Sequence, residues 1–200
     1  MEDSLIKVFP TALYKSNIGR NFNDSENKFL NSQETRNGYE KKYSKDNQIL
    51  DKKEMALIKK FIQIKLENYL ELVYSPKNKI EIYITESWCN YSKKGNSHSP
   101  HLHCNSFLSG TLLIEELEKD SIIVWTNKIQ RNLFLETNKF NEFNSEELEI
   151  PFNKGDLIIF PSDLKHSVPV NNEDKLRLSL SFNSYIKGKI NSRELSKLNI

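Results

Sequence analysis

The sequence predicts a mainly β protein, a sandwich or barrel braced by one N-terminal helix. Three observations support this class. After residue 79 the chain consists of short apolar or alternating runs separated by turns, a spacing typical of antiparallel sandwiches and barrels. A helical period occurs ahead of these runs and not between them, which argues against a βαβ plan. A length of 200 residues is enough to bury roughly 70% of the unfolded surface without a metal or a disulfide.

The elements are expected in the following order. Residues 5–16 alternate between apolar and polar and predict a short strand. Residues 21–47 are polar, and we expect a loop with a helical turn there. From 51 to 73 apolar residues recur every three or four positions, which predicts an amphipathic helix ended by Ser75 and Pro76.

Six strands are expected in the second part of the chain. They cover residues 79–84, 108–114, 121–125, 147–150, 156–160 and 176–186. We expect one domain over residues 1–200. Residues 1–75 would supply the first strand, the loop and the bracing helix, residues 79–187 the β core, and residues 188–200 a C-terminal tail.

Charge and composition narrow the function. Twenty-nine basic and 27 acidic residues give a net charge of +2, which argues against nucleic acid or a membrane surface as a partner. The sequence contains no run suited to a transmembrane span, and its acidic N-terminus is unlike a signal peptide. Two cysteines, Cys89 and Cys104, argue against a disulfide scaffold. We therefore expect a cytoplasmic protein.

The four histidines are the first candidates for chemistry. His98, His101 and His103 fall within six residues, and His166 follows a buried-looking strand. Because His101 and His103 are two apart, a strand would direct both to one face. With His166 from a second strand they could hold a metal ion and leave other coordination positions open. The alternative is four histidines with no shared partner; His98, at an odd spacing, is expected on the other face or in a loop.

The last predicted strand has one apolar and one polar face. A helix would cover the apolar face, so Arg177 and Ser179 on the other face should point inward, toward the histidines. A buried arginine is costly unless an anion neutralises it. This predicts an acidic ligand, with its carboxylate bound by Arg177 and Ser179. The alternative is a solvated arginine on an edge strand.

Four other features are given structural interpretations. Cys104, next to His103, is expected in the core. Trp88 and Trp125 are expected to pack the barrel and not to stack on a substrate. The charged stretch 115–120 is interpreted as a solvated turn between strands.

Three motifs resemble the Fe(II)/2-oxoglutarate dioxygenase superfamily, in particular a bacterial and phage branch that carries His-x-His. Residues 101–110 resemble its His-x-His-x-x-Ser-x-x-Ser-Gly motif, and residues 155–169 resemble Gly-x-Leu-x-x-Phe-Pro-Ser-x-x-x-His-x-Val-Pro. Residues 177–183 resemble Arg-x-Ser-x-Ser-Phe-Asn, and the opening residues 8–14 are also similar to the start of that family. The resemblance covers most of the chain, more weakly between residues 20 and 75.

This resemblance implies a double-stranded β-helix, or cupin-like jelly roll. By motif position His101 and His166 would bind Fe(II), and His103 stands where the superfamily commonly has Asp or Glu. Either His103 is the third ligand, which we favour because the branch resembled here also carries His-x-His, or it does not bind and the site keeps an extra open position. Arg177 would bind the distal carboxylate of 2-oxoglutarate, and Asn90 or Tyr91 lies in a stretch that contacts this cosubstrate in relatives. The implied reaction uses molecular oxygen to hydroxylate a small-molecule or peptidyl substrate, with succinate and CO2 as co-products. A phage-encoded protein would act in the host cytoplasm.

Two alternatives stay open at this point. A cupin-type metal protein without a keto-acid cosubstrate would explain Gly95-x5-His-x-His, but Phe107 and Leu108 stand where its glutamate is expected. A binding jelly roll without catalysis would use residues 126–145 as its binding loop.

Overall fold

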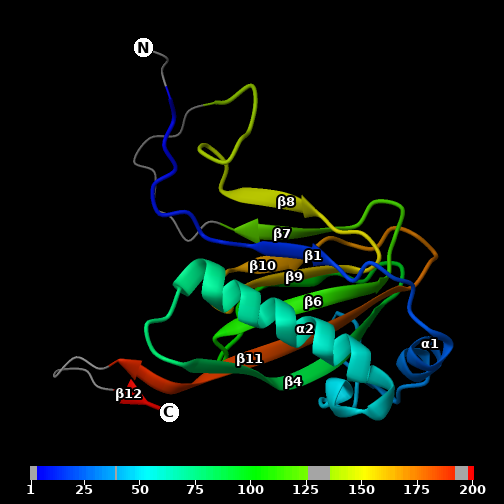
Figure 1. Cartoon of the computed structure of the whole chain (residues 1–200). Coiled ribbons are helices and arrows are strands. Elements are labelled where there is room, and N and C mark those ends of the chain that lie inside the picture. Colours follow the sequence, from blue (N-terminus) through cyan, green and yellow to red (C-terminus); the bar gives the residue numbers. More distant parts are fainter. Residues whose placement is uncertain (1–3, 39, 126–135, 192–197) are drawn as a thin grey trace.

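Two antiparallel sheets form the body of the protein in a computed structural model that describes residues 4–38, 40–125, 136–191 and 198–200 (Figure 1). The large sheet has the order β1-β9-β6-β11-β4-β3-β2, with β12 paired to β11. Its strands are β1 (Tyr14–Asn17), β2 (Thr35–Asn37), β3 (Lys42–Ser44), β4 (Ile80–Ser92), β6 (Leu108–Glu115), β9 (Asp156–Pro161), β11 (Arg177–Asn191) and β12 (Leu198–Asn199).

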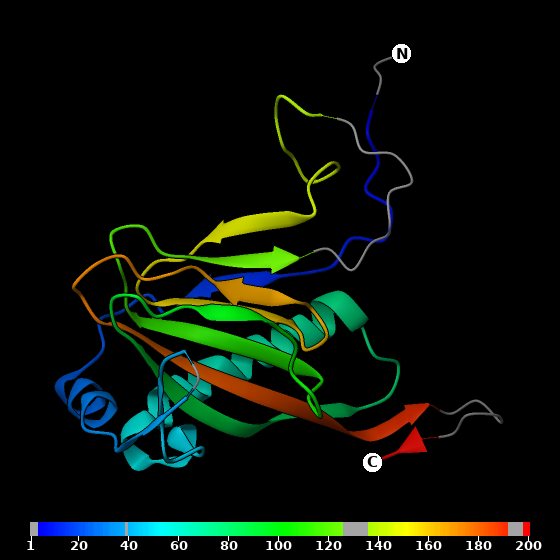
Figure 2. The same cartoon turned by 180° about the vertical axis from the view of Figure 1, so that it is seen from behind.

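The small sheet has the order β5-β10-β7-β8. Its strands are β5 (His98–His101), β7 (Ser121–Trp125), β8 (Glu147–Pro151) and β10 (His166–Val168). Seen from behind, β7 and β8 lie at the end of the molecule away from β4 and β11 (Figure 2). The inner faces of the two sheets meet through an apolar cluster that includes Leu113, Ile122, Ile158 and Phe160.

The central strands of the large sheet are buried on both faces, which explains their continuous apolar runs. On β6, Leu113 faces the small sheet while Leu112 and Ile114 belong to the cluster under the helix. Gly110, on the same strand, has no room for a side chain, because a Cβ there would lie 2.4 Å from Cζ of Phe182. This close packing gives a physical reason for the glycine at the end of the first motif.

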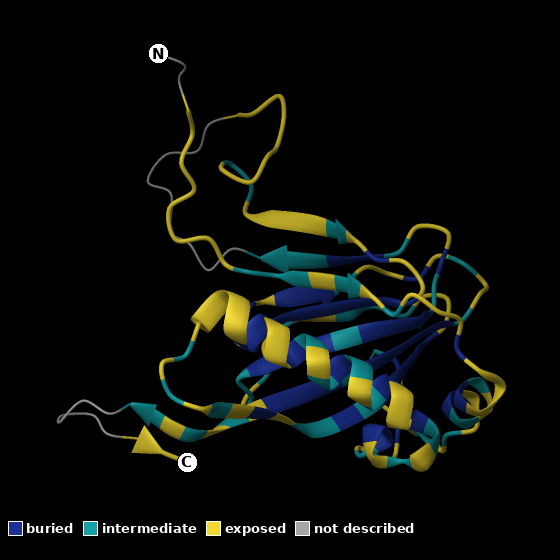
Figure 3. Cartoon of the chain, in the orientation of Figure 1, coloured by how far each residue is buried: buried dark blue, intermediate teal, exposed yellow. Residues whose placement is uncertain are grey.

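Helix α2 (Ala56–Tyr69) covers the outer face of the large sheet. Its buried residues Ile58, Ile62, Leu66 and Tyr69 form one stripe, and the opposite face is exposed (Figure 3). Two 3-10 turns, Ile49–Asp51 and Lys53–Met55, precede α2, and a π-helical turn, Leu70–Tyr74, follows it. The predicted helix over 51–73 is therefore present, with irregular turns at both ends. No helix in the described ranges is long and apolar enough to cross a membrane.

The mainly β class with a helical brace is confirmed, and the errors lie where strands are short. Residues 5–13 are not a strand: Phe9 has a positive φ of 55° and Pro10 follows it, which interrupts an extended chain. The stretch 21–47 contains more than a loop with a turn, namely α1 (Asp24–Asn31), β2 and β3. The predicted tail 188–200 includes the end of β11 and β12. Of the suggested binding loop 126–145, residues 126–135 lie outside the described residues.

Candidate metal centre

Three histidines converge where β5 and β10 meet at the inner side of the small sheet. His101 ends β5 and pairs with His166, the first residue of β10. His103 lies two residues beyond β5, and its N–H donates to the carbonyl of Ser162, 2.9 Å away. One ligand nitrogen from each of the three imidazoles lies within 4.8 Å of the others. The predicted cluster is present, although His103 reaches it from a loop and not, as expected, from the same strand as His101.

His98 also lies in this pocket, contrary to the expectation that its spacing would turn it away. Its ring centroid is 3.9 Å from that of His101. The reason is an irregular register: His166 pairs with His101 while Val168 pairs with His98, so β5 has one residue more than β10 between the two pairs. Such a bulge changes the face on which the following side chains lie.

Hydrogen bonds give the three clustered imidazoles the same tautomer. Nδ1 of His101 donates to the carbonyl of Ser99 and Nδ1 of His166 to that of Leu164, both over 2.9 Å. A carbonyl oxygen only accepts, so Nδ1 carries the proton and Nε2 keeps its lone pair. This is the arrangement in which an imidazole binds a metal through Nε2.

The same tautomer is imposed on His103 by Asn183 and Glu86. The carboxylate of Glu86 accepts from Nδ2 of Asn183 over 2.6 Å, so Oδ1 of Asn183 faces His103. Nδ1 of His103 donates to this oxygen over 2.7 Å. Nε2 of His103 is then a buried nitrogen without a hydrogen-bond partner among the described residues. A buried lone pair without a donor is the feature that a metal ion would satisfy.

The serines of the first two motifs lie behind His103. Oγ of Ser109 donates to Oδ1 of Asn183 over 2.7 Å and lies 2.8 Å from Oγ of Ser162. Ser162 in turn donates to Ser106 over 2.8 Å. These motif serines therefore form a hydroxyl network that holds Asn183, the hydrogen-bond partner of His103.

Burial keeps the clustered rings neutral. It lowers the pKa of His101 and His103 and lowers that of His166 to about 3. His166 is only 5% exposed, and the ring of Phe160 lies 4.5 Å from it, centroid to centroid. Neutral imidazoles with free Nε2 atoms are the ligands that divalent Fe, Zn, Cu and Ni accept. The residues present therefore fit a metal ion with three nitrogen ligands.

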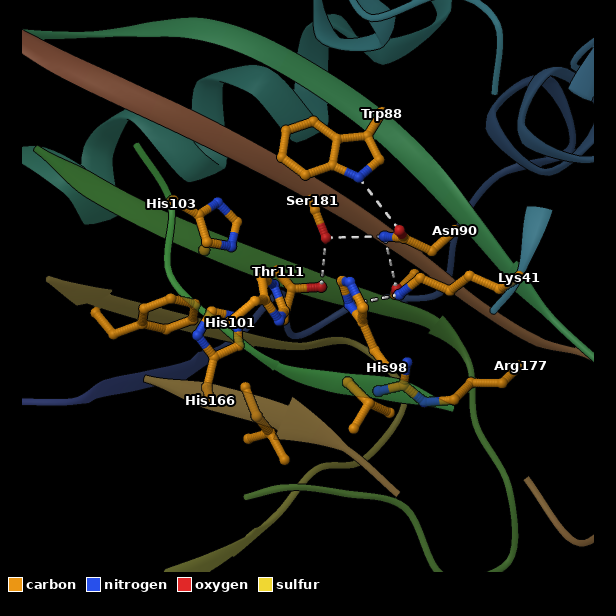
Figure 4. Close-up of a pocket in the computed structure, with 15 residues that line it drawn as sticks. Lys41, Trp88, Asn90, His98, His101, His103, Thr111, His166, Arg177 and Ser181 are labelled. Atoms are coloured by element: carbon orange, nitrogen blue, oxygen red, sulfur yellow. Dashed lines mark hydrogen bonds between the residues drawn. The ribbon is translucent and has the colours of Figure 1, made fainter. Parts of the chain in front are cut away.

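Arg177 and Ser179 line the same pocket as the histidines, as predicted. Figure 4 shows Arg177 beside Lys41 and His98. The predicted need for an external anion is contradicted in part, because the protein supplies one. Nε of Arg177 donates to both carboxylate oxygens of Asp120, over 2.8 and 2.7 Å, and both side chains are at most 4% exposed. The stretch 115–120 does connect two strands, but Asp120 is turned into the protein and is not solvated as expected.

The two candidates on β4 lie on opposite faces. Asn90 lines the pocket, accepts from Nε1 of Trp88 over 3.2 Å and donates to Ser181 over 2.9 Å. Tyr91, the next residue, points into the core under the helix, where its hydroxyl donates to the carbonyl of Leu30. Alternation along β4 therefore removes Tyr91 from the candidate site and keeps Asn90.

Two further expectations are corrected at the rim of the pocket. Trp88 lines the pocket beside the three clustered histidines, with its ring centroid 6.1 Å from that of His103. It therefore does more than pack the β core. Cys104 is exposed, not in the core, because the strand ends at His101 and alternation no longer applies. Trp125 lies farther out, with Lys165 over its ring.

Sequence reasoning missed three residues of the site. Asn183 belongs to a quoted motif but was given no role, and Asp120 was hidden in a charged turn. Lys41 lines the pocket and is 6% exposed, with Nζ 2.9 Å from Nδ1 of His98. No motif surrounds Lys41, and in a chain with 29 basic residues nothing in the sequence distinguishes it.

Fold and site together define a double-stranded β-helix with three clustered histidines that could hold a metal ion. A family model described as "Putative 2OG-Fe(II) oxygenase" matches residues 86–183, the stretch that holds every clustered histidine together with Arg177 and Asn183. Over this stretch the chain matches the 2OG-Fe(II) oxygenase family. Among curated proteins no match is found.

Solved structures support the fold. HygX from Streptomyces hygroscopicus, solved with nickel, 2-oxoglutarate and hygromycin B, has a TM-score of 0.57 at 11% identity and covers 87% of this chain and 82% of its own. A Pseudomonas putida prolyl-4-hydroxylase has a TM-score of 0.55 at 11% identity, covering 86% and 92%. The epimerase SnoN from nogalamycin biosynthesis has a TM-score of 0.57 at 13% identity, and the match covers 80% of this chain and 70% of SnoN. At these identities the likeness concerns the fold.

The role of His103 can be tested by restoring a carboxylate. His103→Asp places an oxygen ligand at the same backbone position, giving two histidines and one carboxylate, a triad suited to Fe(II). We expect it to retain stoichiometric Fe(II) binding. His103→Ala should weaken Fe(II) binding by more than the roughly 10–100-fold that is typical when a residue hydrogen-bonded to a metal ligand is removed. Anaerobic titration with Fe(II) measures both. Equal affinity of His103→Ala and the wild type would show that His103 does not bind the ion.

Proposed function

We propose that this chain is an Fe(II)- and 2-oxoglutarate-dependent dioxygenase that hydroxylates a small-molecule or peptidyl substrate in the cytoplasm. The observation that carries the proposal is the set of three Nε2 atoms with free lone pairs, each fixed by a hydrogen bond from Nδ1. His101, His103 and His166 would hold the ion. The match of residues 86–183 to the oxygenase family model supports 2-oxoglutarate as the cosubstrate.

The ion and the keto acid supply the oxidising chemistry when they are bound. In the balanced reaction, O2 oxidises 2-oxoglutarate to succinate and CO2, one oxygen atom enters succinate, and the other becomes the hydroxyl group of the product. The protein's part is binding and orientation. Asn183 and Glu86 fix the orientation of His103, and Phe160 covers His166 on its apolar side.

The substrate is proposed to approach from the side of the β2–β3 hairpin. A second, more open hollow shares Trp88, His98, His101 and His103 with the inner pocket. It continues over a rim of mixed polarity that includes Arg36, Tyr43, Asn47, Glu86 and Leu102. The inner pocket, with Arg177, Ser179 and Asn90, would take the cosubstrate, and the outer hollow would take the substrate.

The test is sequential loading without oxygen. Fe(II) should raise the midpoint of thermal unfolding, and 2-oxoglutarate should raise it again only when Fe(II) is present. At a hundredfold excess over Kd each ligand adds about 2.7 kcal/mol of stability. A metal response with no second increment would contradict the proposal and favour the cupin-type alternative without a keto acid.

Hydroxylation is distinguished from other outcomes by the product. Among the similar structures are an epimerase and a carbocyclase, so the family alone does not specify it. With oxygen admitted and a pool of metabolites and peptides as substrate, hydroxylation adds one oxygen atom to the product mass for each succinate released. A product of unchanged mass would indicate epimerisation, and one lighter by two hydrogens would indicate ring closure. Either result would contradict hydroxylation.

A further inference from the structure

Two basic side chains enter the pocket on the side across from His103 and His166. They are Lys41 and Arg177, and Figure 4 shows the ring of His98 between Lys41 and the metal-binding histidines. Both are nearly buried, with 6% and 3% of their surface exposed. Two cations in one buried pocket repel each other, so an anion beside either of them stabilises its charged form.

Arg177 already has its anion. Asp120 accepts from Nε through both oxygens, and the ring of Phe152 lies against the guanidinium, 5.9 Å from Cζ to centroid. The charges of Asp120 and Arg177 cancel within the protein. Arg177 is therefore not the side chain for which an incoming dianion makes the largest electrostatic difference.

Lys41 has no such partner. Nζ contacts Nδ1 of His98 over 2.9 Å, and no described carboxylate lies within ion-pair distance of it. The neighbouring Glu40 is turned away and accepts from the backbone N–H and the hydroxyl of Ser99. Burial, with a smaller contribution from the charge of Arg177, lowers the pKa of Lys41 to about 7.

The position of Lys41 is fixed by the sheet. It directly precedes β3, where Lys42 pairs with Tyr91 and Tyr43 with Asn90 on β4. The carbonyl of Lys41 accepts from the N–H of Gly38 over 2.8 Å, which closes the hairpin. The ammonium is thereby held beside Asn90, the inward residue of β4, and is not on a free loop.

A single side chain fills the gap between His101 and Lys41. One imidazole, that of His98, bridges it: its centroid is 3.9 Å from that of His101, and its Nδ1 is 2.9 Å from Nζ. A five-carbon keto diacid with its keto acid end at the metal would carry its far carboxylate two methylenes away, into the space that His98 now fills. A carboxylate is also a stronger acceptor for an ammonium than a neutral imidazole.

We propose that Lys41, from the N-terminal hairpin, binds the distal carboxylate of the keto-acid cosubstrate and takes the place that motif position assigns to Arg177. The carboxylate replaces Nδ1 of His98 as the acceptor, and His98 gives up its position between Lys41 and His101. Arg177 and Asp120 form a neutral pair that shapes the pocket wall. This assignment rests on the proposed function.

The test compares two keto acids on Fe(II)-loaded protein by anaerobic calorimetry. The probes are 2-oxoglutarate and 2-oxopentanoate, which has the same chain length with a methyl group in place of the far carboxylate. Lys41→Met should weaken 2-oxoglutarate by about 30-fold or more, the effect of breaking a buried charge-assisted pair. Binding of 2-oxopentanoate and of Fe(II) should stay as in the wild type.

Three further variants make the result specific. Lys42→Met removes the exposed neighbouring lysine and should change neither keto acid. Lys41→Gln, which keeps a neutral donor, repeats the test if the Met variant is unstable. The double variant Arg177→Met/Asp120→Leu removes the neutral pair and should weaken 2-oxoglutarate less than Lys41→Met does.

Each contrary result has a separate meaning. Wild-type affinity of Lys41→Met for 2-oxoglutarate, together with a loss in the double variant, would return the distal carboxylate to Arg177 and overturn the assignment to Lys41. A wild-type protein that binds Fe(II) but neither keto acid would overturn the proposed function itself, and the assignment with it.

Discussion

His166→Ala is expected to abolish stoichiometric Fe(II) binding while leaving a folded protein. The side chain is buried, and one of its ring nitrogens lies within 4.8 Å of ligand nitrogens of His101 and His103. His101→Ala should behave in the same way. The loss of Fe(II) affinity should exceed the roughly 10–100-fold that follows removal of a residue hydrogen-bonded to a metal ligand. Anaerobic Fe(II) titration, with circular dichroism to confirm the fold, measures both effects.

The matched control is His98→Ala. His98 lies in the same pocket, with its ring against that of His101, but it is not among the three whose ligand nitrogens converge. We expect this variant to bind Fe(II) as the wild type does. Normal iron binding by His166→Ala would show that the ion sits elsewhere. The fold should survive in every case, because the cluster under α2 contains none of the histidines.

Arg177→Met is expected to destabilise the protein by about 3–5 kcal/mol, because it leaves the carboxylate of Asp120 buried without a counter-charge. The sequence alone predicts an external anion for Arg177, whereas the structure pairs it with Asp120, so its removal is costly even without a ligand. Urea denaturation of the metal-free protein measures the change in the free energy of unfolding.

The double variant Arg177→Met/Asp120→Leu separates the pair from its surroundings. When both charges are replaced by apolar groups of similar size, stability should return to within about 1–2 kcal/mol of the wild type, since buried ion pairs and apolar replacements are often equivalent. If the single variant is as stable as the wild type, Asp120 and Arg177 are not a buried pair.

The sequence predicts the parts of the fold whose patterns repeat over enough residues. The four-residue spacing of Ile58, Ile62 and Leu66 indicates a helix. Strands β6 and β9 are buried on both faces, and this produces continuous apolar runs in the sequence. β5 and β10 have four and three residues, too few for a period, and β5 contains Pro100. Their presence depends on pairing with each other, which is a long-range property.

For the site, residue chemistry was more informative than spacing. The rarity of histidine and the motifs around His101 and His166 were enough to predict a metal centre. Whether Asn90 or Tyr91 faces the pocket depends on the register of β4, and whether His98 does depends on a bulge. Asp120 and Lys41 come from a turn and a hairpin brought to the pocket by tertiary contacts, and no local pattern marks such residues.

The shortness of β5 and β10 also predicts where the protein opens locally. Only two residue pairs, His101 with His166 and Val168 with His98, join these strands, so this edge should open locally at a lower free energy than β11, which is paired along its length with β4 and β6. An ion bound by all three histidines binds the closed edge and not the open one, and it raises the free energy of that opening by RT ln(1 + [M]/Kd). We expect the backbone amides around His101 and His166 to exchange their hydrogens faster than those of the central strands in the metal-free protein, and about as slowly once the ion is bound. Iron would thus add a third connection between β5 and β10, which only two residue pairs join.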